Sequence, residues 1–498
     1  MQRAFRRRPQ TGRKGTKSVD HILYWNNVAL EANRRDFTFE TAEGKQAPQQ
    51  GGPTLSSRAL AIVHLAMYDA HAAAVNQPNL PRYLAMPATP AAGMSAAAAV
   101  AAAAHVTLSM LFPRQRAHFD AALSNAGLTG AGVSEGMAFG ASIGKAMMQD
   151  RATDPGAGAD GYVPPQGRGY HRADPANPGQ GFHAPFYGKN SRCFAVQQRH
   201  ELNAPPAVGS PEYTKALRQV RSKGIAPELM GTLPSGSNKR TVDETIRGLF
   251  WAYDGVRGLG TPPRLYNLVV RAVAQAKGNS VDDNARLFAF VNAAMGDAGI
   301  LAWEEKYRFE FWRPVVGLRE HDGSMGPTAP TPASDINNDC DPTWLPLGGP
   351  ASNSSERNFT PPFPAYPSGH ATFGAAALHV TRLFYGVAAG DRTPDALFPG
   401  AFVSEELDGI TRDNAGNVRP RHARKFARGL WQMIEENGYS RIDLGVHWSF
   451  DAFALRADGT PDLERNIGGV PLGLAIAEDI FAFGGKKAPR RSEAVPRD

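Results

Sequence analysis

The sequence predicts an all-α protein of two helical bundles with long Pro/Gly-rich loops. Apolar residues recur at steps of three and four along much of the 498-residue chain, while alternating, strand-like runs are scarce. The 52 Gly and 39 Pro residues indicate long irregular connections, and a hydrophobic fraction of 42% supplies a large core. The sequence contains no Gly-rich phosphate loop of the dinucleotide or Walker type.

In the first half of the chain, helices are expected at residues 57–74, 94–112, 115–125 and 133–151. The first of these places Ala59, Ile62, Val63 and Ala66 on one face, which is the spacing of a buried helical side. The segment 94–112 is uncharged and long enough to cross a bilayer, but it is mostly Ala and contains Ser, Thr and His. We therefore expect a packed helix there and no membrane span.

The second half alternates between helices and two Pro-rich loops at residues 154–211 and 325–367. Helices are expected at 240–254, 264–276, 282–303, 369–385, 420–437, 440–455 and 468–483. Long loops in a compact protein commonly cover a functional site. The expected organisation is a basic N-terminal extension (1–52), an N-terminal bundle with a long covering loop (53–230), a C-terminal bundle with the candidate site (231–485) and a basic tail (486–498).

Charge and cysteine content narrow the function classes. The formal net charge is +7, and much of the surplus lies in the two basic ends, which we expect to be solvated and not to bind nucleic acid. A helical protein that binds nucleic acid or an acidic partner would explain these ends but none of the motifs below.

Cys193 and Cys340 are the two cysteines of the sequence. They are too few for a disulfide framework or a multi-Cys metal site, and a single disulfide between them is left open. Because no signal peptide is visible, cytoplasm is the default expectation, with export by another route left open.

The first candidate motif surrounds Lys306 and Arg313, which are seven positions apart. On a helix, this spacing of nearly two turns would point both cations the same way. Such a pair is commonly found at a surface, but the interleaved aromatic residues indicate partial burial. A buried cation needs an anion.

The second motif is Pro367-Ser368-Gly369-His370, which leads directly into a helix. Ser368 is a good N-cap, and Gly369 allows the backbone to approach a bound group. The amides of Ser368 and Gly369 and the helix dipole would favour an oxyanion. His370, in the first turn, could exchange a proton with it. An ordinary capped helix with an exposed His is the alternative.

The third motif contains Arg441, His447 and Asp451. Arg441 offers a planar fork of donors for two oxygens, and His447 offers a neutral nitrogen as ligand or nucleophile. Asp451 could orient this imidazole, although such pairs are often simple surface contacts. On one ideal helix Arg441 and His447 would diverge by about 120°, so we expect Arg441 at the helix start.

Together the three motifs supply three cations, helix-tip amides and two imidazoles, a set suited to a tetrahedral dianion and unlike a divalent-metal cage. Their order, K-x6-R-P, then P-S-G-H, then S-R-x5-H-x3-D, resembles that of the vanadium haloperoxidases and type 2 phosphatidic acid phosphatases. The segments 251–255, 260–264 and 361–363 resemble the fungal-type vanadium chloroperoxidase branch.

This resemblance implies a vanadate-dependent haloperoxidase that uses hydrogen peroxide to oxidise halide to hypohalous acid, without a change in metal oxidation state. His447 would bind vanadium, and Asp451 would orient that histidine from behind. His370 would hydrogen-bond the apical oxygen, with Asp254 supporting His370. Lys306 would polarise the peroxide. The residues expected to hold the orthovanadate oxygens are Lys306, Arg313, Ser368, Gly369 and Arg441.

The resemblance also implies a halide pocket at Trp303, Pro361, Pro362 and Phe363. Bromide is the expected halide, and the order among chloride, bromide and iodide is left open, as are an organic substrate and a homo-oligomer. Phosphate should compete for the vanadate site because it shares the shape and charge of vanadate. The alternative function is a soluble acid phosphatase in which His447 forms a phosphohistidine and His370 protonates the leaving alcohol.

Overall fold

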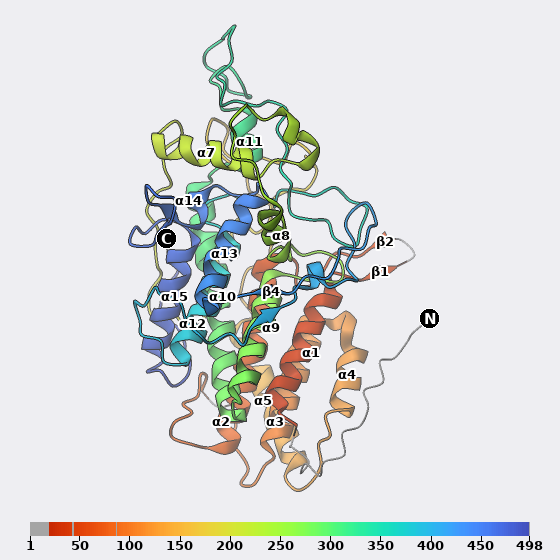
Figure 1. The fold of residues 1–498 in the computed structure, drawn as a ribbon. Coiled ribbons are helices and arrows are strands. Elements are labelled where there is room, and N and C mark those ends of the chain that lie inside the picture. Colours follow the sequence, from red (N-terminus) through yellow and green to blue (C-terminus); the bar gives the residue numbers. More distant parts are fainter. Residues whose placement is uncertain (1–18, 42–43, 86, 498) are drawn as a thin grey trace.

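The computed structural model describes residues 19–41, 44–85 and 87–497, and it is almost entirely helical, which confirms the all-α prediction (Figure 1). The strands in these ranges form three short antiparallel pairs. They are β1 (Glu40–Thr41) with β2 (Gly44–Lys45), β3 (Ala401–Phe402) with β4 (Arg424–Lys425), and β5 (Ala454–Leu455) with β6 (Pro461–Asp462).

The N-terminal helices lie side by side at one end of the molecule (Figure 1). They are α1 (His21–Asp36), α2 (Gly52–Val75), α3 (Ala96–Leu111), α4 (Arg116–Ser124) and α5 (Val133–Asp150). Small residues bring α3 and α5 close together, since a Cβ on Gly140 would lie 2.0 Å from the carbonyl oxygen of Ala99. The segment 94–112 is thus a packed helix, as the sequence predicted.

The long helix α10 (Val281–Phe309) contacts α2 of the N-terminal group and also α12 (Gly369–Phe384) and α15 (Gly469–Phe483) of the C-terminal group. One hydrophobic core runs through both groups. By length and composition α10 could cross a membrane, but 94% of its apolar window is buried inside the protein, as in a core helix. The remaining helices are α6 (Tyr187–Asn190), α7 (Pro211–Lys223), α8 (Val242–Phe250), α9 (Pro262–Lys277), α11 (Pro314–Arg319), α12 (Gly369–Phe384), α13 (Gly429–Asp443), α14 (Ser449–Ala452) and α15 (Gly469–Phe483), with 3-10 turns at Pro113–Gln115, Pro227–Thr232 and Glu405–Leu407.

Both ends of the chain are more structured than the sequence suggested. The expected N-terminal extension contains α1, whose buried Trp25, Ala29 and Leu30 pack into the core, while residues 1–18 lie outside the described residues. The described part of the basic tail is held to the surface, because Arg286 donates to two carbonyls of the tail and the amide of Ser492 donates to Phe194. Cys193 and Cys340 are free, buried thiols.

Two expected helices differ in a way that affects the site. The structure replaces the helices at 420–437 and 440–455 with α13, a turn and the single-turn α14. Gly445 causes this break, because its φ of +73° favours glycine and a Cβ there would lie 2.4 Å from the carbonyl oxygen of Gly224. The expectation that Arg441 begins a helix was therefore wrong, since it lies in the last turn of α13.

Candidate active site

The three motifs meet at one cavity of about 230 Å³. Its walls include Trp303 from α10, Gly369 and His370 from α12, Arg441 from α13 and His447 from the turn before α14. Lys306 and Arg313 of the first motif are not among the lining residues, but they lie directly behind the wall, next to Phe363 and His447. The juxtaposition that the sequence analysis required is therefore present in the tertiary structure.

Lys306 is fully buried near the end of α10. Its Nζ donates to the carbonyl oxygens of Pro364 (2.8 Å), Ala365 (3.1 Å) and Pro367 (2.5 Å). The ammonium also lies 5.1 Å from the ring centroid of Phe363. Burial, followed by the positive charge of Arg313, lowers the pKa of Lys306 well below its ordinary value, while the three carbonyls favour its charged form.

Arg313 lies beyond α10, so the helical spacing argument for its direction was wrong. The helix ends at Phe309, followed by Glu310 in the left-handed conformation, and Arg313 is the N-cap residue of α11. Its Nε donates to the carbonyl of Phe363 (2.8 Å), and Nη1 lies 2.9 Å from Nε2 of His447. Nη2 is buried and has no partner among the described residues. Burial lowers the pKa of Arg313 to about 9.

Arg441, Asp254 and His370 form a second charged group. The guanidinium of Arg441 donates to both carboxylate oxygens of Asp254, at 2.8 and 3.3 Å, and its Nε is buried without a partner in the described chain. His370 Nε2 lies 2.6 Å from the carbonyl of Ala252 and 3.6 Å from Asp254. Asp254 therefore holds Arg441 more closely than it holds His370. Burial, followed by Arg441, lowers the pKa of His370 to about 3.

His447 is oriented by Asp451, and the pair is buried and not the surface contact that is common at this spacing. Oδ2 of Asp451 accepts from His447 Nδ1 (2.8 Å) and from the amide of Trp448 (3.0 Å). Because the carboxylate is an acceptor, Nδ1 carries the hydrogen, and the electron pair of Nε2 accepts from Nη1 of Arg313. Burial and the three neighbouring cations keep the pKa of His447 well below its ordinary value. The imidazole is thus neutral, with a nitrogen at Nε2 that can act as a ligand.

The N-terminus of α12 supplies donors, but not all those expected. The amide of Ser368 donates to the carbonyl of Asp451 (2.7 Å), so this amide is engaged and only the Ser368 hydroxyl remains for a bound group. Gly369 provides close access, since a Cβ there would lie 3.1 Å from the ring of Trp303. The amides of Gly369 and His370 belong to the first turn, where the helix leaves N–H groups unpaired.

These donors fit a tetrahedral oxyanion. Lys306, Arg313 and Arg441 are buried beside only two carboxylates, Asp254 and Asp451, and two guanidinium N–H groups lack a partner in the described residues. Buried donors without acceptors are costly, so an anion that accepts from them would stabilise the site. Within the described ranges, no cluster of three or more His, Cys, Asp or Glu residues could hold a metal ion as a protein cage.

Aromatic and proline residues form one wall of the cavity, and they include the four residues that the resemblance assigned to a halide pocket. The rings of Trp303 and Phe363 lie 4.7 Å apart, and Pro361 and Pro362 also line the cavity. His183 was not predicted from the sequence, and its ring centroid lies 6.0 Å from those of both aromatic rings. It belongs to the long covering loop, and no local pattern marks it. A larger hollow of about 480 Å³ adjoins this wall through Gly255, Phe359 and Pro362.

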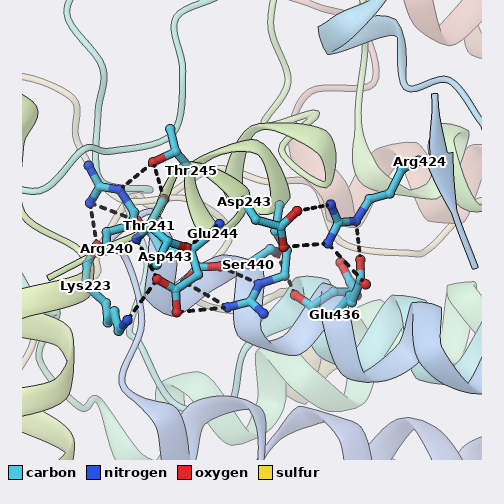
Figure 2. Close-up of polar contacts among 12 residues, drawn as sticks. Lys223, Arg240, Thr241, Asp243, Glu244, Thr245, Arg424, Glu436, Ser440 and Asp443 are labelled. Carbon is cyan, nitrogen blue, oxygen red and sulfur yellow. Dashed lines mark hydrogen bonds and ion pairs between the residues drawn. The ribbon is translucent and has the colours of Figure 1, made fainter. Parts of the chain in front are cut away.

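A polar network behind the site holds the end of α13 that carries Arg441 (Figure 2). Arg247 on α8 forms two hydrogen bonds with Asp443, at 2.6 and 3.0 Å. Glu244 on α8 accepts from Lys223 at 2.8 Å. Further contacts in the figure join Arg240 to Asp443, and Arg424 to Asp243 and Glu436. Through these pairs α8 restrains the last turn of α13.

Comparisons with known proteins agree with this geometry. Residues 9–193 match the sequence model of the vanadium chloroperoxidase N-terminal domain, and residues 286–461 match that of the second helical-bundle domain of the same proteins. The chain is 34% identical to the vanadium chloroperoxidase of Curvularia inaequalis over 591 aligned positions, which cover 97% of this chain and 92% of that protein.

Two solved bacterial structures share the fold. A vanadium-dependent iodoperoxidase superposes with a TM-score of 0.62 at 18% identity, covering 96% of this chain and 99% of the other. A holo-type vanadium-dependent chloroperoxidase superposes with a TM-score of 0.59 at 15% identity, covering 89% of this chain and 95% of the other.

Proposed function

The chain belongs to the vanadium chloroperoxidase family and is a vanadium-dependent haloperoxidase, and from this premise we propose how its own residues carry out the reaction. The observation that carries the assignment of roles is the pair of guanidinium N–H groups, Nη2 of Arg313 and Nε of Arg441, that are buried without a partner in the described residues, together with Nε2 of His447, whose one contact there is Nη1 of Arg313. Vanadate held at this place would accept from both arginines, and His447 would be its nitrogen ligand.

Each residue has a role that follows from its contacts. The oxygens of vanadate would accept hydrogen bonds from four residues: Arg313, Arg441, Ser368 through its hydroxyl and Gly369 through its amide. Asp254 fixes the direction of Arg441 through its two hydrogen bonds. Bound vanadate supplies a Lewis-acidic centre at which hydrogen peroxide becomes able to oxidise halide.

His370 serves as the proton-transfer residue. The carbonyl of Ala252 accepts from Nε2–H, so the neutral ring has its free electron pair on Nδ1, which has no partner among the described residues. His370 lines the cavity, and Nδ1 can accept a proton from peroxide as it enters. Lys306 stabilises negative charge that develops on the peroxide oxygens, because it is a preorganised cation in a dry site.

The halide is expected to approach along the wall formed by Trp303 and Phe363. These rings exclude water. The centroid of the Phe363 ring lies 4.9 Å from the guanidinium of Arg313 and 5.1 Å from the ammonium of Lys306. We propose bromide as the principal halide, since it is the more easily oxidised, and chloride as a slower substrate. Phosphate, which has the same shape and similar charge as vanadate, competes for the site.

The direct test compares two activities in one preparation. Apo-protein is assayed with and without added orthovanadate for peroxide-dependent bromination of monochlorodimedone and for hydrolysis of p-nitrophenyl phosphate. Bromination should require vanadate, and hydrolysis should be slow and inhibited by it. Hydrolysis that is fast, together with bromination that vanadate does not stimulate, would instead assign a phosphatase acting through His447.

The residue assignment is tested with His447→Ala, which should abolish tight vanadate binding and bromination. His105→Gln is the matched control, because this histidine of α3 pairs only with Asp120 and lies outside the cavity lining. Normal bromination by the His447→Ala protein would contradict the assignment of Nε2 as the ligand.

A further inference from the structure

The side chain of His183 lies in the halide wall, and the mechanism above gives it no role. It lines the same cavity, and its ring lies 6.0 Å from Trp303 and 6.0 Å from Phe363, which are themselves 4.7 Å apart. The three rings therefore form one cluster. Trp303 and Phe363 contribute apolar ring surfaces to this cluster, whereas the imidazole of His183 contributes two nitrogen atoms, Nδ1 and Nε2.

The main chain of His183 forms the hydrogen bonds that hold the loop to the rest of the site. Its amide donates to the carbonyl of Pro362 (2.8 Å), and its carbonyl accepts from Trp303 Nε1 (3.3 Å) and from the Tyr307 hydroxyl (2.7 Å). None of these bonds requires an imidazole. A purely structural residue here could have any side chain that fits, so the presence of the ring needs a separate explanation.

One edge of the imidazole is fixed by the start of α2. Nε2 lies 2.9 Å from the Thr54 hydroxyl, and Gly52 leaves room for the ring, since a Cβ there would lie 2.3 Å from Cε1. The Thr54 hydroxyl has no other side-chain hydrogen bond in the described residues, and in the tautomer that we assign it donates its hydrogen to Nε2. The ring hydrogen is then on Nδ1.

The other nitrogen is available to a ligand. Nδ1 of His183 has no partner among the described residues, yet it is not enclosed, in contrast to both ring nitrogens of His171, which are buried and unpartnered. Burial lowers the pKa of His183 to about 4, so the ring is neutral at ordinary pH and Nδ1–H is a neutral donor. The positive end of the α2 dipole, at Gly52 and Pro53, lines the same cavity.

We propose that His183 is a halide-binding residue, with Nδ1–H donating to a halide anion that rests against Trp303 and Phe363 and with the Thr54 hydroxyl fixing the required tautomer. This inference rests on the proposed haloperoxidase function. A halide that enters an aromatic wall loses hydration, and it needs a donor of its own because the arginines and the other two imidazoles face the oxyanion. A neutral N–H supplies attraction without adding a fourth charge to a site that already has three buried cations.

Two substitutions at His183 separate the donor from the shape of the side chain. His183→Leu removes the N–H, and the KM for bromide should rise about tenfold, the loss typical of one hydrogen bond to a charged group, while kcat changes less. His183→Asn places an amide near the position of Nδ1, and it should restore the KM to within a few-fold of the wild-type value. Vanadate affinity and the KM for peroxide should be unchanged in both.

Thr54→Val tests the tautomer with little change in volume. Without the hydroxyl, the ring can place its hydrogen on Nε2, so the KM for bromide should rise by a few-fold. The control is again His105→Gln, which should leave every parameter unchanged. An unchanged bromide KM in folded His183→Leu protein would overturn the proposal.

Diffraction supplies a readout that does not depend on turnover. Crystals of the vanadate-loaded wild-type protein soaked in bromide should show an anomalous peak in contact with Nδ1 of His183, and the peak should weaken in the His183→Leu protein. A bromide peak in the cavity away from this ring would overturn the proposal, even if His183→Leu failed to fold. Absence of vanadate-dependent bromination by the wild-type protein would instead refute the proposed function itself.

Discussion

The contact between Asp451 and His447 allows a graded prediction for vanadate binding. Oδ2 of Asp451 accepts both the His447 Nδ1 hydrogen and the Trp448 amide, and its side chain is fully buried. In Asp451→Asn, the amide oxygen can keep both hydrogen bonds but the negative charge is lost. In Asp451→Ala, the acceptor is lost as well, and the imidazole is free to change its tautomer and direction.

The expected magnitudes follow from these two losses. Removing the outer partner of a metal-binding histidine typically weakens metal affinity by about 10- to 100-fold. We expect Asp451→Asn near the lower limit, about tenfold or 1.4 kcal/mol, and Asp451→Ala near the upper limit, about 2.7 kcal/mol. Loss of a negative charge near the bound anion would by itself raise the vanadate affinity. This effect acts through space, whereas the hydrogen bond acts directly on the ring of His447, so we expect the loss of affinity to be the larger effect.

Vanadate affinity is measured by equilibrium dialysis of apo-protein and by titration of the bromination rate. Asp395→Asn is the matched control, because Asp395 is another buried carboxylate outside the cavity lining; it accepts from Arg382 and from three backbone amides, of Leu397, Leu430 and Trp431. It should lower thermal stability without changing vanadate affinity. Wild-type affinity in both Asp451 variants, at comparable stability, would refute the role assigned to this carboxylate.

The other predictions concern rate, access, competition and pH. Lys306→Ala should lower kcat for bromination by at least tenfold at saturating vanadate while changing vanadate affinity less, because its charge acts on the peroxide. Gly369→Ala should weaken vanadate binding in dialysis, since the new Cβ would lie 3.1 Å from the Trp303 ring and crowd the donor amide. Phosphate should raise the apparent Kd for vanadate in proportion to its concentration. Burial raises the pKa of Asp69 from 3.8 to about 7, so the folded state binds this proton more tightly than the unfolded state. The free energy of unfolding should therefore fall as pH rises between these two values. Asp69→Asn should flatten this pH dependence in thermal melts.

The fold class could be predicted because it depends on local periodicity. Apolar residues recur every three or four positions along α2 and α10, and this pattern does not depend on contacts with distant segments. Because alternating strand patterns are scarce, few other fold classes are compatible with the sequence. The helix ends near the site could not be predicted in the same way. Gly445 ends the helical run because its backbone meets Gly224, which is more than two hundred positions away.

The composition of the site could also be predicted from the sequence, since a tetrahedral oxyanion needs cations and the amides of a helix N-terminus, and the three motifs supply these together with two imidazoles. What the motifs could not indicate was which donors remain free. The Ser368 amide is occupied by the carbonyl of Asp451, and Asp254 binds Arg441 more closely than His370. These are choices among competing partners, and they depend on distances between segments.

By itself, then, the sequence determined the all-α class, the chemistry of the bound anion and the residues able to hold it, because residue type and local spacing carry that information. Only the tertiary structure decided how Arg313 and Arg441 reach the cavity and that His183, from a loop with no recognisable pattern, completes the aromatic wall. The reason is physical: a local pattern specifies what a side chain can do, whereas its direction and free hydrogen-bonding groups depend on the neighbours that packing brings to it.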